Sequence, residues 1–565
     1  MITLTSSQIA TLTAAGNSAH DWQQVRVSEQ FDASAIRGCR FEGVVEIETG
    51  VTLINSTICN YHICSGTTIC DTLRLECRHS SSFGNGTRVA TVNENGSRMV
   101  TIYNDLTAQV AYIAAMYRHR TDIVAAITRH AEQYAAAEHK NIGTIGNNCT
   151  IIGARFIREV NMGNNVVVEG ASLLEDATLL EGAYVGIDVK ASHFIAAQDS
   201  TIDSGAIVER AFVGERAVVA KGFTAVDSLL FAATHLENGE ACSIFAGPYT
   251  VSHHKSSLLI AGIFSFFNAG SGTNQSNHLF KSGAVHQAVH RRGCKFGSNG
   301  YVMAPADEGE FTVVIGRHTK HHDTSALPFS YLIENNGTST LLPAFALRSY
   351  GTVRDIAKWR ERDTRRFFRD NISYNEYNPY LTAKALSAVA LLEQLLQGGD
   401  SQELHHRNTT IKRSLAQRGI ALYKSYIAAA LGSMLATGSR TDDHSEQWVD
   451  LAGQYVPQQH LEQQLDNFTT TEALEALLSE LHRNYDNLAH TWAVETLSAQ
   501  LGHDATDEDI AAAIAAGKQA QSSLRSITDA DRIADTAPAM SIGYGIDSKS
   551  EAIRLADFAA VQHLE

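Results

Sequence analysis

Histidine is the residue type with the clearest potential for chemistry in this 565-residue sequence, because it clusters. Of 24 histidines, eight fall between positions 253 and 322, which is a third of them in about an eighth of the chain. An imidazole can act as a general base near neutral pH, and it can also bind a metal ion. Three interpretations therefore compete for this window: catalysis, metal binding, and hydrogen-bonded scaffolding.

Polar strings surround these histidines. Residues 268–278 and 316–325 are rich in Asn, Ser, Thr, Gly and His, and a mixed segment, 327–334, follows. Such strings contribute little to an apolar core. They suit a cleft in which side-chain donors and acceptors converge on a polar ligand.

The elements that position the window follow a six-residue period, which fits neither a helix nor simple strand alternation. It is typical of a β-solenoid in which each hexad makes one short strand and one turn, with its apolar residue pointing inward. Three hexads make a coil of about 18 residues. The apolar residues that set the period are Phe41, Ile47, Leu53, Ile63, Ile69, Leu75, Ile145, Ile151, Ile157, Met162, Val168, Leu174, Leu180, Ile202, Val208, Val213 and Val219.

Glycine and proline support this interpretation, with 41 and 7 residues respectively. The first proline is Pro248, and most of the glycines precede residue 350. Glycine tolerates the positive φ of tight turns, whereas proline removes a donor from a strand ladder. A glycine-rich, proline-free stretch of this length favours the solenoid.

Helical patterns fill the rest of the chain. Leu106, Val110, Ile113 and Tyr117 share one helical face. After residue 350 the segments 381–396 and 414–435 are helical, and Thr506 can cap a short helix over 507–516 that Gly517 would end. We therefore expect a mainly β fold with α elements: N-terminal β-helix coils (1–104), a helical insert (105–140), the main β-helix with the histidine window (141–349), and an α-helical C-terminal domain (350–565).

Composition narrows the partners. A formal charge of −16 disfavours binding to nucleic acid or to an anionic membrane. The sequence contains neither a signal-peptide pattern nor an apolar run of about 18 residues. We therefore expect a cytoplasmic protein with reduced cysteines and a small-molecule substrate.

The hexads over residues 36–100 and 141–345 resemble the left-handed β-helix of the hexapeptide-repeat transferases. The strings 274–278, 316–323 and 329–334 also resemble an uncharacterised bacterial family with this fold. The resemblance implies a transferase of acyl, nucleotidyl or phosphoryl groups. Its substrate would be a sugar, a nucleotide-sugar or a similar polyhydroxylated compound, its donor acyl-CoA or a nucleotide-sugar, and its assembly a homo-oligomer, by analogy a trimer.

The same resemblance implies roles for the window, since these acyltransferases use one histidine to deprotonate the acceptor. The candidates for catalysis are His278, His318, His321 and His322, with Asp323 to orient one of them. The candidates for substrate binding are Asn274, Asn277, His253, His254, His286, His290, Arg317 and Lys320.

Two alternatives stay open. One is a metal-dependent enzyme similar to the β-helical carbonic anhydrases, with zinc as the weaker cofactor candidate and His286, His290 and His322 as candidate ligands. However, His286 and His322 are separated by two coils of three hexads, or about 10 Å, which is too far to share one ion directly. The other alternative is a non-catalytic solenoid that binds a ligand or serves as a scaffold.

Two further patterns are assigned structural roles. Cys59, Cys64, Cys70 and Cys77 follow at steps of five, six and seven, but they lack a C-x₂-C knuckle, so packing inside the coils is favoured over zinc binding. Residues 359–369 contain five arginines. We expect these to pair with nearby acids, with an anion pocket at the domain junction as the alternative.

Overall fold

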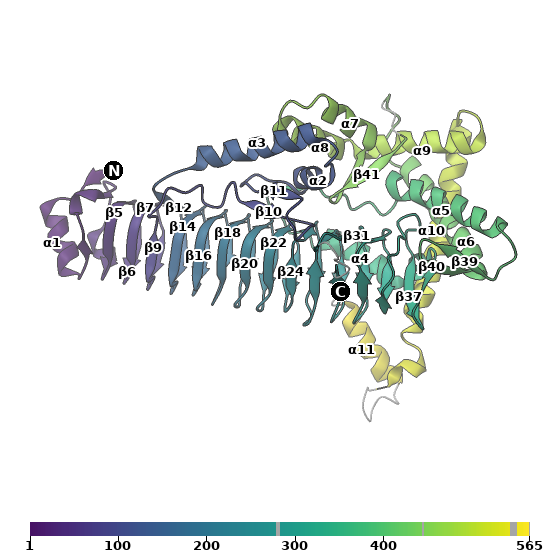
Figure 1. Ribbon diagram of the computed structural model, residues 1–565, viewed down its shortest axis with the longest axis horizontal. Helices are drawn as coiled ribbons and strands as arrows, with labels where there is room; N and C mark the ends of the chain where they lie inside the picture. Colours follow the sequence, from purple (N-terminus) through teal and green to yellow (C-terminus); the bar gives the residue numbers. More distant parts are fainter. Residues whose placement is uncertain (278–282, 443–445, 543–550, 564–565) are drawn as a thin grey trace.

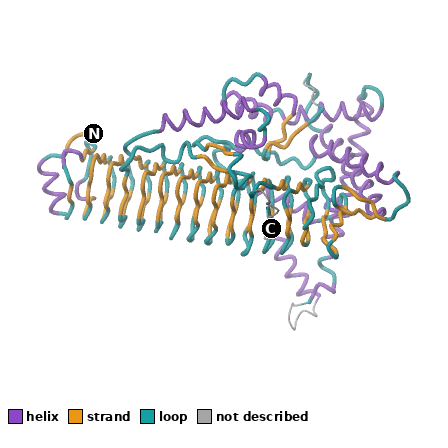
Figure 2. Tube along the Cα trace, in the orientation of Figure 1, coloured by secondary structure: helices purple, strands orange, loops and turns teal. Residues whose placement is uncertain are grey.

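A computed structural model describes residues 1–565 except 278–282, 443–445, 543–550 and 564–565. Its main feature is a long row of parallel strands, with helices gathered mostly at the C-terminal end (Figure 1). Figure 2 shows the same row as successive coils of strand and turn. The chain is therefore a mainly β parallel solenoid, as the six-residue period predicted.

Each coil in the central part of the solenoid is one position shorter than three hexads. Ile157, Leu174, Ala191, Val208 and Ala225 are register partners on successive strands, and the step between them is constant. Two hexads and one pentad make such a coil, which corrects the expected three hexads and explains the slips in the period. The strands are β14 (Phe156–Met162), β16 (Leu173–Leu179), β18 (Lys190–Ala196), β20 (Ile207–Val213) and β22 (Thr224–Leu230).

Corners between the sides of the coil use left-handed backbone. One corner falls at Glu159, Asp176, His193, Arg210 and Asp227, all with φ between 47° and 54°. This φ costs non-glycine residues some strain, which the flanking parallel ladders overcome. This row of corners therefore does not require glycine.

The interior of the solenoid holds the predicted apolar residues. Of the seventeen that set the period, all but Leu180 are buried. At that position the chain turns Leu179 inward instead, and Leu180 packs on the outside.

The N-terminal coils comprise β5 (Arg40–Ile47), β6 (Thr52–Ile54), β7 (Thr57–Ile63), β8 (Thr68–Cys70) and β9 (Arg74–Glu76).

One outer side of the solenoid carries large apolar residues and is covered. Ile195, Phe212, Leu229, Phe245 and Ile263 lie in one outward row on successive coils and are buried. The covering elements include the hairpin of β10 (Arg88–Ala90) and β11 (Met99–Thr101), α2 (Ala108–Met116) and α3 (Thr121–Glu138), which lie between β9 and the next coil in the chain (Figure 1).

The C-terminal region packs its helices around this covered side and the end of the solenoid. It contains α4 (Tyr350–Glu361), α5 (Pro379–Gln397), α6 (Arg413–Leu435), α7 (Gln458–Asp466), α8 (Thr471–Arg483), α9 (Tyr485–Leu501), α10 (Asp507–Ala534) and α11 (Glu551–His563). Two short hairpins were not expected there: β39 (Glu403–His406) with β40 (Thr409–Lys412), and β41 (Trp448–Leu451) with β42 (Gln454–Pro457).

The N-terminal cap predicted at Thr506 is confirmed, but the predicted stop at Gly517 is wrong. Helix α10 continues to Ala534, because Gly517 serves a crossing with α6 rather than a helix end. A Cβ on Gly517 would meet the Cα of Gly432 at 2.6 Å. The two glycines let the backbones of α6 and α10 touch.

Among the described helices, none combines the length and the apolar character that a membrane span requires.

Candidate functional site

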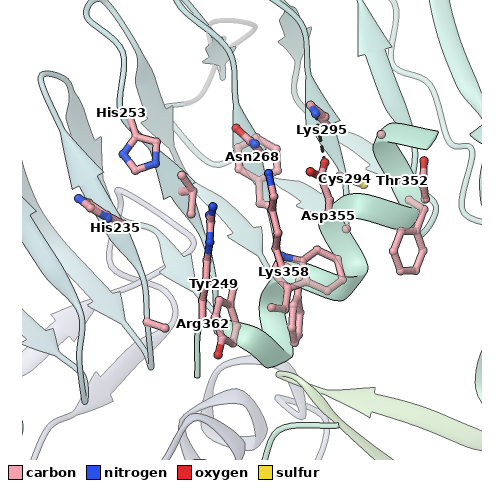
Figure 3. Close-up of a pocket in the computed structure, with 18 of the residues that line it drawn as sticks. His235, Tyr249, His253, Asn268, Cys294, Lys295, Thr352, Asp355, Lys358 and Arg362 are labelled. Carbon is pink, nitrogen blue, oxygen red and sulfur yellow. Dashed lines mark hydrogen bonds and ion pairs between the residues drawn. The ribbon is translucent and has the colours of Figure 1, made fainter. Parts of the chain in front are cut away.

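A cleft lies between one flat side of the solenoid and helix α4, and it encloses about 600 Å³ (Figure 3). Its floor is a single outward row on successive strands, in register at Val218, His235, Val251, Asn268, Lys295, Val313 and Tyr331. These strands are β21 (Val218–Ala220), β23 (His235–Glu237), β26 (Val251–Ser252), β29 (Asn268–Ala269), β32 (Lys295–Phe296), β35 (Val313–Ile315) and β37 (Tyr331–Asn335).

The wall opposite is α4 with the loop after it. Two contacts tie wall to floor: Nζ of Lys295 lies 3.1 Å from the Asp355 carboxylate, and Nε of Arg216 donates to Oγ1 of Thr364 at 3.1 Å. Figure 3 shows Lys358 and Arg362 extending from this wall toward the strands. The cleft volume falls within the range typical of small-molecule and cofactor sites.

Positive charge dominates this cleft. Asp355 is the one carboxylate among the described residues that line it, while the cationic side chains there are Arg216, Lys295, Lys358, Arg362 and Arg365. Arg365 is held by Asp363 and by the carbonyl of Asp370. Arg362, by contrast, is exposed and has no ion-pair partner among the described residues. The cleft therefore favours an anionic ligand.

Aromatic rings form the apolar end of the cleft. Tyr249, Phe266 and Phe311 occupy the same corner of three coils, all with φ between 50° and 58°, in the left-handed region, and Gly293 occupies this corner on the coil between Phe266 and Phe311. Trp359 of α4 packs against them, with its ring centroid 4.6 Å from that of Phe266 and 6.0 Å from that of Phe311. Bulky residues rarely adopt this backbone conformation, so the three aromatic residues are a specific feature of this corner. They form the surface against which α4 packs.

Two histidines meet at the rim of the cleft. The ring centroids of His235 and His253 are 4.5 Å apart, and both rings lie near Glu237. Nε2 of His235 lies 3.1 Å from Oε1, Nδ1 of His253 lies 3.9 Å from Oε2, and Nζ of Lys221 donates to Oε2 at 2.8 Å. Both imidazoles remain solvent-accessible, at 37% and 43% side-chain exposure.

The protonation of this cluster suits base chemistry. Burial lowers the pKa of His253, and the neighbouring His235 adds to this effect while Glu237 opposes it. Burial alone would raise the pKa of Glu237, but hydrogen bonds from Lys221 and His235 hold it below its usual value. A neutral imidazole beside an ionised carboxylate can accept a proton near neutral pH.

Of the predicted catalytic histidines, the three that the structure describes, His318, His321 and His322, do not line this cleft. His318 and His322 are buried in the solenoid, where Nδ1 of His318 contacts Oγ of Ser339 at 2.8 Å. His321 is half-buried, and its carbonyl accepts a hydrogen bond from Asn408. Asp323 pairs with Arg407, and His278 lies outside the described residues. Their catalytic roles stay predictions without support from a shared cleft.

His290 and His322 instead share one buried carboxylate. Nδ1 of His290 lies 2.6 Å from Oε2 of Glu308, and Nε2 of His322 lies 2.7 Å from Oε1. Burial alone would raise the pKa of Glu308, but the two histidines hold it well below its usual range. Phe264 stacks on His290, with 4.8 Å between ring centroids. The two imidazoles lie on opposite oxygens, which fits an internal ion network better than one metal centre.

The predicted substrate-binding residues are scattered. Of these, His253 lies in the cleft lining, and Asn277 is buried with its amide on Glu94. The others are placed as follows: His254, Arg317 and Lys320 exposed, Asn274 and His286 half-buried, and His290 inside the solenoid.

The site residues that sequence reasoning missed are His235, Asn268, Lys295 and Arg362 in the cleft lining, together with Glu237 beside its rim. Register was the missing signal. The floor row advances by a nearly constant step from coil to coil, except between Asn268 and Lys295, where the chain leaves the coil and the step is much longer.

The arginines of residues 359–369 mostly pair with acids, as expected: Arg365 with Asp363, Arg366 with Asp199 and Arg369 with Asp105.

Comparison with known proteins reveals two domains of unknown function and one relative. Residues 431–564 match the domain of unknown function DUF6819. An "Uncharacterized protein" of Treponema pallidum (strain Nichols) is 23% identical over 586 residues, covering 87% of this chain and 80% of the relative. Residues 48–396, more than half of the chain, match the domain of unknown function DUF4954. The chain therefore belongs to the DUF4954 family.

Proposed function

We propose that the chain is a group transferase whose active site is the cleft between the solenoid and α4. The observation that carries the proposal is the His235–Glu237–His253 cluster at the rim of a cleft lined by cations. A base and an anion-binding surface in one cleft are what transfer from a charged donor to a hydroxyl or amine requires.

The donor in this proposal carries a nucleotide diphosphate, as acyl-CoA and nucleotide-sugars do. Arg362 is the first candidate for its phosphates, because its guanidinium is exposed and can form paired hydrogen bonds to oxygen. Trp359 and Phe266 offer apolar rings at the same end of the cleft. Asn268 on the floor supplies an amide for a hydroxyl group.

The acceptor in this proposal is a sugar-like alcohol or amine, and His253 is its base. Nδ1 of His253 faces Glu237, which leaves Nε2 for the acceptor proton. For an acyl donor, the acceptor oxygen or nitrogen attacks the thioester carbon, the C–S bond breaks, and the departing thiolate takes the proton from His253. His235 acts as a positioning residue through Glu237.

A second candidate is metal-dependent catalysis at the same cluster. The ligand atoms of His235, Glu237 and His253 all lie within 4.8 Å of one another. Two imidazoles and a carboxylate are a known ligand set for catalytic zinc. Zinc analysis of the purified protein separates the candidates: one equivalent that is lost in H235Q would favour the metal.

The winding and assembly complete the proposal. We infer a left-handed solenoid that forms trimers, by analogy with the hexapeptide-repeat transferases, which the repeating apolar hexads resemble. Light scattering on the purified protein tests the trimer, and a monomer in dilute solution would contradict it.

The test of the transferase uses acetyl-CoA and UDP-N-acetylglucosamine as probes. We expect one of them to bind in calorimetry, and an acceptor panel of amino sugars to yield turnover. H253Q should keep donor binding but lose turnover by about 100-fold or more, because it removes the base. H254Q, the adjacent exposed histidine outside the cleft, is the matched control. Absence of binding for both probes, or full turnover in H253Q, would refute the proposal.

A further inference from the structure

A second group of metal-ligating side chains lies on the N-terminal coils, far along the row from the cleft (Figure 1). Strands β5 and β7 are parallel neighbours, with Glu46 in register with His62. Glu48 and Cys64 directly follow the next register pair, Ile47 and Ile63. Two carboxylates, an imidazole and a thiol thus form a compact group on two adjacent coils.

These side chains converge on one point. The ligand atoms of Glu48, His62 and Cys64 all lie within 4.8 Å of one another. Ligands of a tetrahedral zinc ion at bond lengths of about 2.0–2.3 Å lie roughly 3.5 Å apart, so small side-chain adjustments suffice. Cys64 is half-buried, and Glu48 and His62 keep 31% and 27% side-chain exposure, so solvent can reach the site.

The surroundings of His62 orient it for an ion. Its Nδ1 lies 2.8 Å from Oε2 of Glu46, and its Nε2 lies 2.9 Å from Oε1 of Glu48. When Nδ1 donates to Glu46, the lone pair of Nε2 points at a second carboxylate, and a cation between them removes that repulsion. A carboxylate on the far nitrogen is the usual partner of a metal-bound histidine.

Glu48 is also held in place. The backbone N–H and the hydroxyl of Ser65 donate to its Oε2 at 3.0 and 2.7 Å, which leaves Oε1 facing His62. On the next coil, Gly146 follows Ile145, the register partner of Ile63, so no side chain stands beside Cys64 at that position. The group is therefore preorganised.

We propose that Glu48, His62 and Cys64 bind one zinc ion, with Glu46 as the positioning residue for His62. Sulfur, imidazole nitrogen and carboxylate oxygen form a mixed set that zinc accepts, whereas calcium and magnesium prefer oxygen alone. The Glu48 carboxylate and the Cys64 thiolate neutralise the ion. Three protein ligands leave the fourth position to water or a small ligand. The ion links two successive coils.

The competing state is a protonated His62 paired with both glutamates, without an ion. Cobalt titration separates the two states, because a cobalt–thiolate bond produces a charge-transfer band in the near ultraviolet. We expect one Co²⁺ per chain at this site with that band, displaced by one Zn²⁺. C64S and H62Q should each weaken binding by about 100-fold, and E46Q by roughly 10- to 100-fold.

Two controls define the result. C70S changes another half-buried cysteine of the same coils and should bind as the wild type does. H235Q should keep the thiolate band, which separates this site from the cluster at the cleft. Circular dichroism checks that each variant is folded. Absence of the band in the wild type, or its persistence in both C64S and H62Q, would overturn the proposal.

Discussion

Asp450→Asn should loosen the junction between the solenoid and the C-terminal helices. The Arg292 side chain is 2% exposed at this junction, and its Nε lies 2.6 Å from Oδ2 of Asp450. It also donates to the carbonyls of Ser373 and Gly453. The guanidinium lies between two rings, 4.1 Å from the centroid of Phe266 and 4.3 Å from that of Tyr455.

The magnitude follows from this burial. Removing one partner of a buried ion pair leaves an uncompensated charge and costs about 3–5 kcal/mol of unfolding free energy. Asparagine keeps one acceptor oxygen for Arg292, so we expect a loss of about 3 kcal/mol, at the low end of that range. Asp199→Asn breaks a bidentate pair with Arg366, which is 58% exposed. That variant should lose far less unfolding free energy than D450N does, because an exposed ion pair contributes little to stability.

Urea unfolding followed by tryptophan fluorescence measures both variants, since Trp359 and Trp448 lie near this junction. The double variant R292M/D450N removes the stranded charge and should recover at least half of the lost free energy. Because Phe266 also contacts Trp359, D450N should weaken donor binding in the cleft as well. A cost below about 1 kcal/mol for D450N, or a double variant no more stable than D450N, would contradict an uncompensated buried charge at Arg292.

Three further outcomes are expected. R362A should weaken binding of the donor probe by roughly 10- to 100-fold in calorimetry, because charged hydrogen bonds contribute about 1.5–3 kcal/mol. The control variant R366A should bind the probe as the wild type does. Equal losses in the two variants would contradict the role of Arg362 in binding the donor. Burial lowers the pKa of His318 to about 4, below its unfolded value of 6.5, so the neutral form is favoured in the fold. Up to roughly 3 kcal/mol of unfolding free energy is therefore lost as the pH falls from about 6.5 toward 4. In H318Q the urea midpoint should depend less on pH between about pH 7.5 and 5 than it does in the wild type. The same pH dependence in both proteins would contradict this role of His318. G517A should lower the thermal midpoint, because its Cβ would meet Gly432 at 2.6 Å and overpacking costs about 1–3 kcal/mol; a raised midpoint would show that helix propensity dominates.

The solenoid could be predicted from the amino-acid sequence alone. Inward positions such as Ile151 and Val208 are apolar in most coils, so the repeat can be recognised from residue type and counted. The same holds for local signals such as the Thr506 cap, where neighbouring residues satisfy the helix end. These features depend on residues close in the chain, and the structure confirms them.

The sites depended on tertiary structure. His235 and His253 meet only because a coil returns the chain to the same side, and the step between floor positions is not constant along the row. The density of histidines in the sequence therefore pointed to residues 253–322 as the candidate site. In the structure, however, His290 and His322 of this window turn inward and contact Glu308. The other wall of the cleft is set by the packing of helix α4, since no local sequence pattern shows that Arg362 lies across a cleft from Asn268. Outward positions are free to vary in type, and only the register of the coils places them together.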